Sequence, residues 1–234
     1  IKFNNNFNKP NVLIAGCGTG RHIFITQNYL NSNILAVDLS KSSLSYAKRK
    51  IEEHGFRNVE FLQSDILQLN SLNKKFDIIE SVGVLHHMKE PLKGLEILLN
   101  LLEPHGFLKL GLYSKIARED IIIAREFIQH NRLKSTIDDI RNIRQTIINE
   151  KKNKLLRKIS LSGDFYSTSS IRDLIFHEQE KQFSLPQISK ILTKFNLEFL
   201  GFIDLDIKSK YSELYLNDKN NTSLKNWGDF ELSH

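Results

Sequence analysis

A glycine-rich loop follows a short apolar run near the start of the chain, and it limits the fold more than any other feature. The run from Val12 to Ala15 is too short for a helix and is apolar on both faces, so it predicts a buried strand. Gly16, Gly18 and Gly20 follow at once. Glycines let the backbone turn tightly and let a ligand approach it closely.

An acid stands at the end of the next apolar run. Asp38 comes eighteen residues after Gly20 and directly follows the run from Ile34 to Val37. A strand, a glycine-rich turn and an acid at the tip of the next strand form the first half of a nucleotide-binding α/β sheet. The Asp38 carboxylate is thereby placed to accept hydrogen bonds from ribose hydroxyls.

The spacing of the glycines distinguishes between cofactors. A dinucleotide-binding fingerprint, G-x-G-x-x-G, needs its third glycine at position 21, where this chain has Arg21. The pattern G-x-G-x-G followed by an acid resembles class I S-adenosylmethionine (SAM)-dependent methyltransferases. The alternative is a tight turn in another kind of α/β protein.

Strand and helix patterns alternate through the first 115 residues. We expect strands at 12–15, 34–37, 59–62, 76–80 and 107–113, with helices that begin at Ser40 or Ser42 and at Pro91. This alternation predicts an α/β fold, a Rossmann-like and mostly parallel sheet with helices on both faces.

The alternation breaks after residue 115. Helices are expected at 116–130, at 137–157, from Ser169 or Ser170, and at 188–195, with a strand-like run at 197–203. We expect residues 116–185 to form a helical cap inserted into the sheet domain. The SAM-binding core would then be residues 1–115 and 186–234.

Further motifs resemble class I methyltransferases of the type 11 and 12 groups. Ser64-Asp65-Ile66-Leu67 looks like the motif whose acid binds the adenine amino group, and Phe76–Ile79 followed by Val82–Met88 looks like the motif that ends the fourth strand. The resemblance implies SAM as cofactor and the following binding residues: Gly16, Cys17, Gly18, Thr19, Gly20, Asp38, Leu39, Ser64, Asp65, Ile66, Ser81 and Val82.

A narrower resemblance covers the second half. Gly111–Ser114, Asp164–Ser167 and Leu185–Ile188 are similar to segments of bacterial methyltransferases fused behind tetratricopeptide repeats. This likeness implies a tetratricopeptide-repeat region in the parent chain, but it supplies no substrate.

Two features concern the ends of the chain. The sequence starts with Ile1 rather than Met, close to the first strand. After residue 203 the tail holds no convincing apolar strand to serve as the seventh, antiparallel strand of the family. We therefore expect a fragment of a longer protein that lacks this strand. In the alternative, Tyr211 to Leu216 forms it.

The candidate catalytic residues are His86, His87, Tyr166 and His177. The methyl of SAM is already activated, so transfer mainly requires alignment, with a base only where the acceptor must lose a proton. His86 and His87 follow the fourth strand, where a base would lie beside the methyl group. Asp173, His177 and Glu180 would share one face if a helix continued through them. No metal-ligand spacing is convincing, so no metal is expected.

Composition restricts the setting and the partners. Cys17 is the sole cysteine and no run reaches the length of a membrane span, so we expect a cytoplasmic protein without a membrane segment. The net charge of +6 equals the excess in residues 131–160, which hold nine basic and three acidic residues. No aromatics interleave with them, so a solvated helix surface is preferred to a nucleic-acid site.

Three functions remain in competition. The preferred one is SAM-dependent methyl transfer to an unidentified acceptor, either a small molecule or a protein side chain. The second is a SAM-binding regulatory or scaffold module without catalysis. The third is a nucleic-acid methyltransferase, which Glu80-Ser81-Val82-Gly83 disfavours because base-amino methyltransferases carry an Asn/Asp-Pro-Pro-aromatic motif there.

Overall fold

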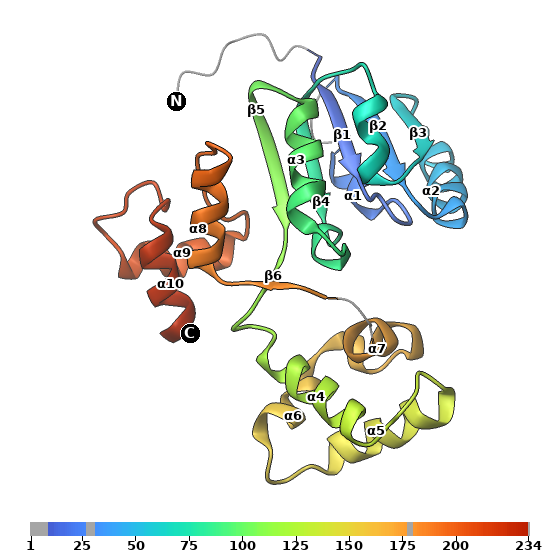
Figure 1. Cartoon of the computed structure of the whole chain (residues 1–234), viewed down its shortest axis with the longest axis vertical. Helices are drawn as coiled ribbons and strands as arrows, with labels where there is room; N and C mark the ends of the chain where they lie inside the picture. The colour runs from blue at the N-terminus through green and yellow to red at the C-terminus, as the bar shows by residue number, and fades with distance from the viewer. Residues whose placement is uncertain (1–8, 27–30, 177–179, 234) are drawn as a thin grey trace. The chain divides into compact units, whose positions relative to one another are not determined.

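The computed structural model describes residues 9–26, 31–176 and 180–233 (Figure 1). The chain divides into two compact units, Ile1–Leu112 and Tyr113–His234. The first unit holds a parallel sheet with helices, and the second is mostly helical.

The sheet of the first unit has five strands, and each neighbouring pair is parallel. Their order across the sheet is β3-β2-β1-β4-β5. Along the chain, β2 and β3 are therefore added on one side of β1, and β4 and β5 are then added on the other side. The strands are β1 (Asn11–Ala15), β2 (Asn33–Asp38), β3 (Val59–Gln63), β4 (Phe76–Val82) and β5 (Leu102–Gly111).

Helices cover both faces of this sheet. They are α1 (Arg21–Thr26), α2 (Lys41–Glu53) and α3 (Pro91–Leu101), with short 3-10 turns η1 (Ile66–Ser71) and η2 (Leu85–His87). Parallel connections are right-handed, so the reversal of strand order at β1 places α1 and α2 on one face and α3 on the other. Leu44, Ala47 and Ile51 of α2 recur at helical spacing and share a core with Ile14 and Ile23.

The sequence predicts where these helices begin. Ser40 caps α2, because its hydroxyl accepts a hydrogen bond from the backbone N–H of Ser43 at 3.2 Å. Of the two predicted starting points of this helix, Ser40 and Ser42, the structure therefore supports Ser40. Pro91 opens α3 in its first turn, where a missing N–H costs nothing.

Four helices of the second unit share an apolar core. They are α4 (Glu119–His130), α5 (Ile137–Asn149), α6 (Lys154–Lys158) and α7 (Thr168–Ile175), with 3-10 turns η3 (Ile159–Leu161) and η4 (Gly163–Phe165). Ile140, Ile143 and Ile147 of α5 are each at most 1% exposed and form one stripe of that helix. Helices therefore occupy this part of the chain, as its pattern predicts, although the helix expected at 116–130 begins at Glu119.

A second core in this unit is aromatic. It gathers residues of α8 (Leu185–Lys194), α9 (Leu205–Leu214) and α10 (Leu224–Ser233) around Tyr211 and Trp227. These two rings stack with centroids 3.7 Å apart, and the Tyr211 hydroxyl donates to Asp218. Ser184 and Gln187 form a capping box at the start of α8. Two short parallel strands, β6 (Tyr113–Ser114) and β7 (Gln182–Phe183), complete the unit.

Three local predictions were wrong. The helix expected at 137–157 divides, because Asn153 starts a new helix by capping Leu156 N. The strand expected at 197–203 does not form: Phe199 and Phe202 lie three residues apart and both pack into the aromatic core, which a strand of period two does not allow. The segment Tyr211 to Leu216 is no seventh strand, because α9 extends to Leu214.

The fold class is confirmed in its main terms. The sheet is Rossmann-like and parallel, and within the described part of the chain no strand follows β7. The division into a core of 1–115 with 186–234 and a cap of 116–185 stays a prediction. Among the described residues, no helix combines the length and apolar character that crossing a membrane demands.

A cluster of charged side chains around the buried Glu180 carboxylate lies beside β7 within the second unit. The Glu180 carboxylate accepts hydrogen bonds from Arg118 at 2.6 and 3.1 Å, from Arg125 at 2.8 Å and from Gln182 at 3.0 Å. Burial raises the pKa of Glu180, but the bonds from Arg118 and Gln182 and the two arginine charges outweigh it and lower the pKa to about 2. Because α7 ends at Ile175, Glu180 does not share a helical face with Asp173, contrary to the prediction.

We expect Glu180→Gln to lower the free energy of unfolding by about 2–4 kcal/mol, because it leaves two half-buried guanidinium groups without their carboxylate. Urea unfolding followed by circular dichroism measures the loss. Asp138→Asn is the control: it breaks an exposed pair with Arg141 and should cost less than about 1 kcal/mol.

The same cluster predicts an acid dependence. A carboxyl whose pKa falls from 4.5 to about 2 on folding stabilises the protein above pH 4.5, and this contribution is lost as the pH falls toward 2. The stability of Glu180→Gln should therefore vary less over that interval than the wild type. Parallel pH profiles of the two proteins would contradict the assignment.

Candidate functional site

The glycine loop folds over the end of β2. The backbone N–H groups of Gly16 and Cys17 both donate to the Val37 carbonyl, at 2.8 and 2.9 Å. Gly16 has a φ of +85°, and a Cβ there would lie 2.3 Å from a Val84 methyl carbon. Only glycine satisfies both the left-handed backbone and the close approach. The loop therefore holds the end of β1 against β2 and the segment after β4.

Asp38 fixes the middle of that loop. Its carboxylate accepts hydrogen bonds from Gly18 N at 2.7 Å and Ser40 N at 2.9 Å. The acid at the tip of β2 thus faces the glycine loop, as the spacing of the sequence predicts. Its oxygens keep lone pairs that a ligand's hydroxyl groups can use.

Cys17 lies in the same loop and is buried. Burial and the nearby Asp38 charge raise the pKa of its thiol to about 12, so it stays protonated at neutral pH. A protonated buried thiol packs as a small apolar side chain and is a poor nucleophile.

The end of β3 adjoins Asp38. Ser64 N donates to the Asp38 carbonyl at 3.2 Å. Asp65 caps η1 by accepting from Leu67 N at 2.9 Å, and Ile66 is buried behind it. Leu39, between these segments, is 69% exposed and leaves apolar surface at the edge of the sheet. A carboxylate beside exposed apolar surface suits a flat, polar-edged ring.

The end of β4 carries the two adjacent histidines. His86 is buried, His87 is half-buried, and their ring centroids lie 4.2 Å apart at 60°. Ser81 is fully buried, and its hydroxyl has no hydrogen-bond partner among the described residues. Within the same part of the chain, no group of three His, Cys, Asp or Glu residues is placed to hold a metal ion.

The structure brings one part of the predicted set together. Direct hydrogen bonds join Gly18 and Ser64 to Asp38, and the other cofactor candidates stand at the carboxyl ends of β1 to β4. Tyr166 belongs to the second unit, is exposed and donates its hydroxyl to the Ser160 carbonyl at 3.0 Å. His177 lies outside the described residues.

A buried carboxylate at this edge was not predicted. Glu80 of β4 is 1% exposed and pairs with Lys109 of β5 at 3.2 Å. The available signal was a glutamate between Ile79 and Ser81 near the end of the strand Phe76–Val82.

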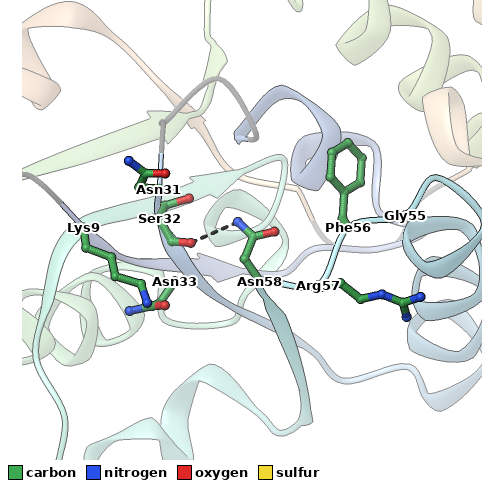
Figure 2. A pocket seen from close by; sticks show the side chains of 8 residues that line it. All are labelled: Lys9, Asn31, Ser32, Asn33, Gly55, Phe56, Arg57 and Asn58. Carbon is green, nitrogen blue, oxygen red and sulfur yellow. Dashed lines mark hydrogen bonds between the residues drawn. The ribbon is translucent and has the colours of Figure 1, made fainter.

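An open groove of about 760 Å³ lies at the other end of the strands. Its lining residues lie just before or at the start of β1, β2 and β3, at the amino ends of these strands. Figure 2 shows that the Arg57 side chain points away from Lys9 and Asn33, so its polar groups do not converge on one point. Parallel α/β sheets bind ligands at the carboxyl ends of their strands, which makes the glycine loop the candidate site.

A family model described as a methyltransferase domain matches residues 7–163. The chain belongs to this family. The resemblance to class I SAM-dependent methyltransferases, inferred from the glycine loop, is thereby confirmed.

Two curated relatives are similar to this chain over different lengths. An uncharacterized protein of Synechococcus sp. is 30% identical over 212 residues, which cover 85% of this chain and 49% of that protein. A probable (S)-tetrahydroprotoberberine N-methyltransferase of Papaver bracteatum is 35% identical over 79 residues, 33% of this chain and 22% of that protein. The chain spans about half or less of the length of the curated relatives it matches.

A solved structure shares the fold. PKMT2 from Rickettsia typhi superposes with a TM-score of 0.70 at 22% identity, over 96% of this chain and 46% of that one.

The close approach at Gly16 is open to test. Gly16→Ala should lower the free energy of unfolding by about 2–4 kcal/mol, because the methyl meets Val84 and φ is left-handed. Gly55 has a φ of +79° with nothing near its missing Cβ, so Gly55→Ala should cost only about 1–2 kcal/mol. Urea unfolding followed by circular dichroism compares them, and equal costs would show that Val84 does not crowd the loop.

Proposed function

We propose that this domain transfers the methyl group of SAM to an acceptor. One observation carries the proposal: the Asp38 carboxylate accepts a hydrogen bond from Gly18 of the glycine loop. This contact lies at the carboxyl ends of the strands in a domain of the methyltransferase family. The sulfonium of SAM activates its methyl, so the protein's task is to bind the cofactor and align the acceptor.

The residues at this edge fit the nucleoside of SAM. Asp38 would accept hydrogen bonds from the ribose hydroxyls, and Asp65 would accept one from the adenine amino group. Exposed Leu39 and buried Ile66 offer apolar surface to the ring. The rest of the proposed binding set is Gly16, Cys17, Gly18, Thr19, Gly20, Ser64, Ser81 and Val82.

Removal of Asp38 should weaken the cofactor site selectively. We expect Asp38→Ala to weaken the free energy of SAM binding, measured by calorimetry, by roughly 1–3 kcal/mol. This is the size of a lost charge-assisted hydrogen bond. Asp77→Ala is the matched control, because Asp77 also accepts a backbone N–H, from Asn11 at 2.8 Å, but at the amino edge of the sheet. Equal losses in both variants, or tighter binding of NADH than of SAM, would contradict the assignment.

The acceptor is proposed to be a small molecule or a protein side chain. Two relatives support the first class by name: the Papaver N-methyltransferase and a demethylmenaquinone methyltransferase of Lactococcus lactis, which is 28% identical over 97 residues, 41% of this chain and 38% of that protein. Nucleic acid is not the proposed acceptor. The basic segment 131–160 has no aromatic residue, and Arg144 within it donates to the Phe165 carbonyl.

The proposed catalytic residues are His86, His87, Tyr166 and His177. A histidine after β4 can take a proton from the acceptor, because its usual pKa lies near neutrality. Tyr166 and His177 are proposed to position the acceptor.

We expect His87→Ala and His86→Ala to lower methyl transfer by roughly 10²-fold or more while the Kd for SAM stays nearly unchanged, as loss of a general base predicts. His130→Ala, at the exposed end of α4, is the control and should retain full transfer. Tyr166→Phe should lower methyl transfer without raising the Kd for SAM. Loss of SAM affinity in parallel with transfer would make the two histidines cofactor ligands instead.

The alternative is a regulatory or scaffold module that binds SAM without catalysis. Incubation with methyl-labelled SAM and a cell extract, followed by size filtration, distinguishes the two. Retained label that protease digestion releases indicates a protein acceptor, and label in the filtrate beyond SAM indicates a small one. SAM binding with no transferred label supports the alternative. A tetratricopeptide-repeat region stays a prediction, as does a cytoplasmic setting, which the sole, buried Cys17 supports.

A further inference from the structure

Glu80 is a buried charge in a strand of otherwise mostly apolar residues. Its side chain is 1% exposed, and its Oε1 lies 3.2 Å from Lys109 Nζ on the neighbouring strand. A carboxylate is costly to bury unless it is paired, and Lys109, 21% exposed, supplies the pairing. The strand register makes these two residues direct partners of β4 and β5.

The pair lies below the glycine loop. On its other side Glu80 pairs with Ile14 of β1, two residues before Gly16. Residues directly opposite in neighbouring strands project to the same face, so Glu80 shares the face of Ile14, which packs with Ile23 of α1.

His22 of α1 joins this cluster. Burial lowers the pKa of His22, the Glu80 charge raises it, and the Lys109 and Arg21 charges lower it, with a net decrease. Both members of the ion pair therefore lie close enough to act on a side chain that directly follows the glycine loop.

Stability alone gives no reason for the pair. A buried ion pair contributes little net free energy, and well-packed apolar residues in its place are often neutral or stabilising. Ile14 and Ile79 beside the pair are buried and apolar, so two aliphatic side chains would suit this part of the sheet as well. A pair that adds little stability is a candidate for a second role, the binding of a charged ligand.

The order of the strands says which part of the ligand reaches them. Asp38 ends β2 and Ser64 follows β3, and both strands lie on one side of β1. A nucleoside held there leaves the rest of the cofactor to cross β1 toward β4 and β5. That remaining part of SAM is its amino-acid end, which carries one ammonium and one carboxylate group.

We propose that the Glu80–Lys109 pair recognises the zwitterionic amino-acid end of SAM. This inference rests on the proposed function and adds binding residues that the glycine-loop motifs do not include. Glu80 offers a negative group and Lys109 a positive one, which complement the ammonium and the carboxylate of the ligand.

Two ligands that differ only in this end provide the test. S-adenosylhomocysteine carries the amino-acid end, and 5′-methylthioadenosine has the same nucleoside and sulfur without it. In calorimetry, Glu80→Gln should raise the Kd for S-adenosylhomocysteine roughly tenfold, because one charge-assisted contact is lost. The Kd for 5′-methylthioadenosine should stay unchanged. Asp38→Asn is the matched control and should weaken both ligands.

The double variant Glu80→Leu/Lys109→Met guards against misfolding. Apolar replacement of both partners should keep the sheet folded, by circular dichroism, while it removes the preference for S-adenosylhomocysteine over 5′-methylthioadenosine. A double variant that keeps the wild-type preference would overturn the inference, as would Glu80→Gln weakening both ligands equally or neither. A wild-type chain that binds neither ligand contradicts the proposed function and this inference together.

Discussion

The site depends on how the end of β1 is tied to the end of β2. Gly16 and Cys17 donate to the Val37 carbonyl, and Gly18 donates to the Asp38 carboxylate. These bonds need a left-handed turn with no side chain at Gly16, because Val84 occupies that space. They also hold the Asp38 carboxylate against the glycine loop at the carboxyl ends of the strands. Without this turn the ends of β1, β2 and β4 would not meet.

The order of strands then divides that edge into two halves. On the β2 and β3 side, Asp38, exposed Leu39 and Asp65 give hydrogen-bond acceptors beside apolar surface, which suits a nucleoside. On the β4 and β5 side, Glu80 and Lys109 give paired opposite charges. The two ends of SAM match these two halves, because SAM carries a nucleoside at one end and a zwitterionic amino-acid group at the other. The sulfonium between them would lie near the switch in strand order, where α/β sheets bind ligands.

Local patterns allowed most of the first unit to be predicted, because glycine spacing, the Ser40 cap and Pro91 act within a few residues. Long-range packing explains the failures. Phe199 and Phe202 join an aromatic core built by Trp227, so a strand-like run does not become a strand. Glu180 finds Arg118 more than sixty residues away. The burial of Glu80 was not predicted, since its partner Lys109 comes from a different strand.

The central claim is that SAM binds at the carboxyl edge of the sheet rather than in the groove at its amino edge. Amide hydrogen exchange with and without S-adenosylhomocysteine tests this directly. The account predicts slower exchange at residues 16–20, 38–40, 64–67 and 80–84, with no change at the groove segments 31–33 and 55–58. Protection confined to the groove segments, with the glycine loop unaffected, would contradict it.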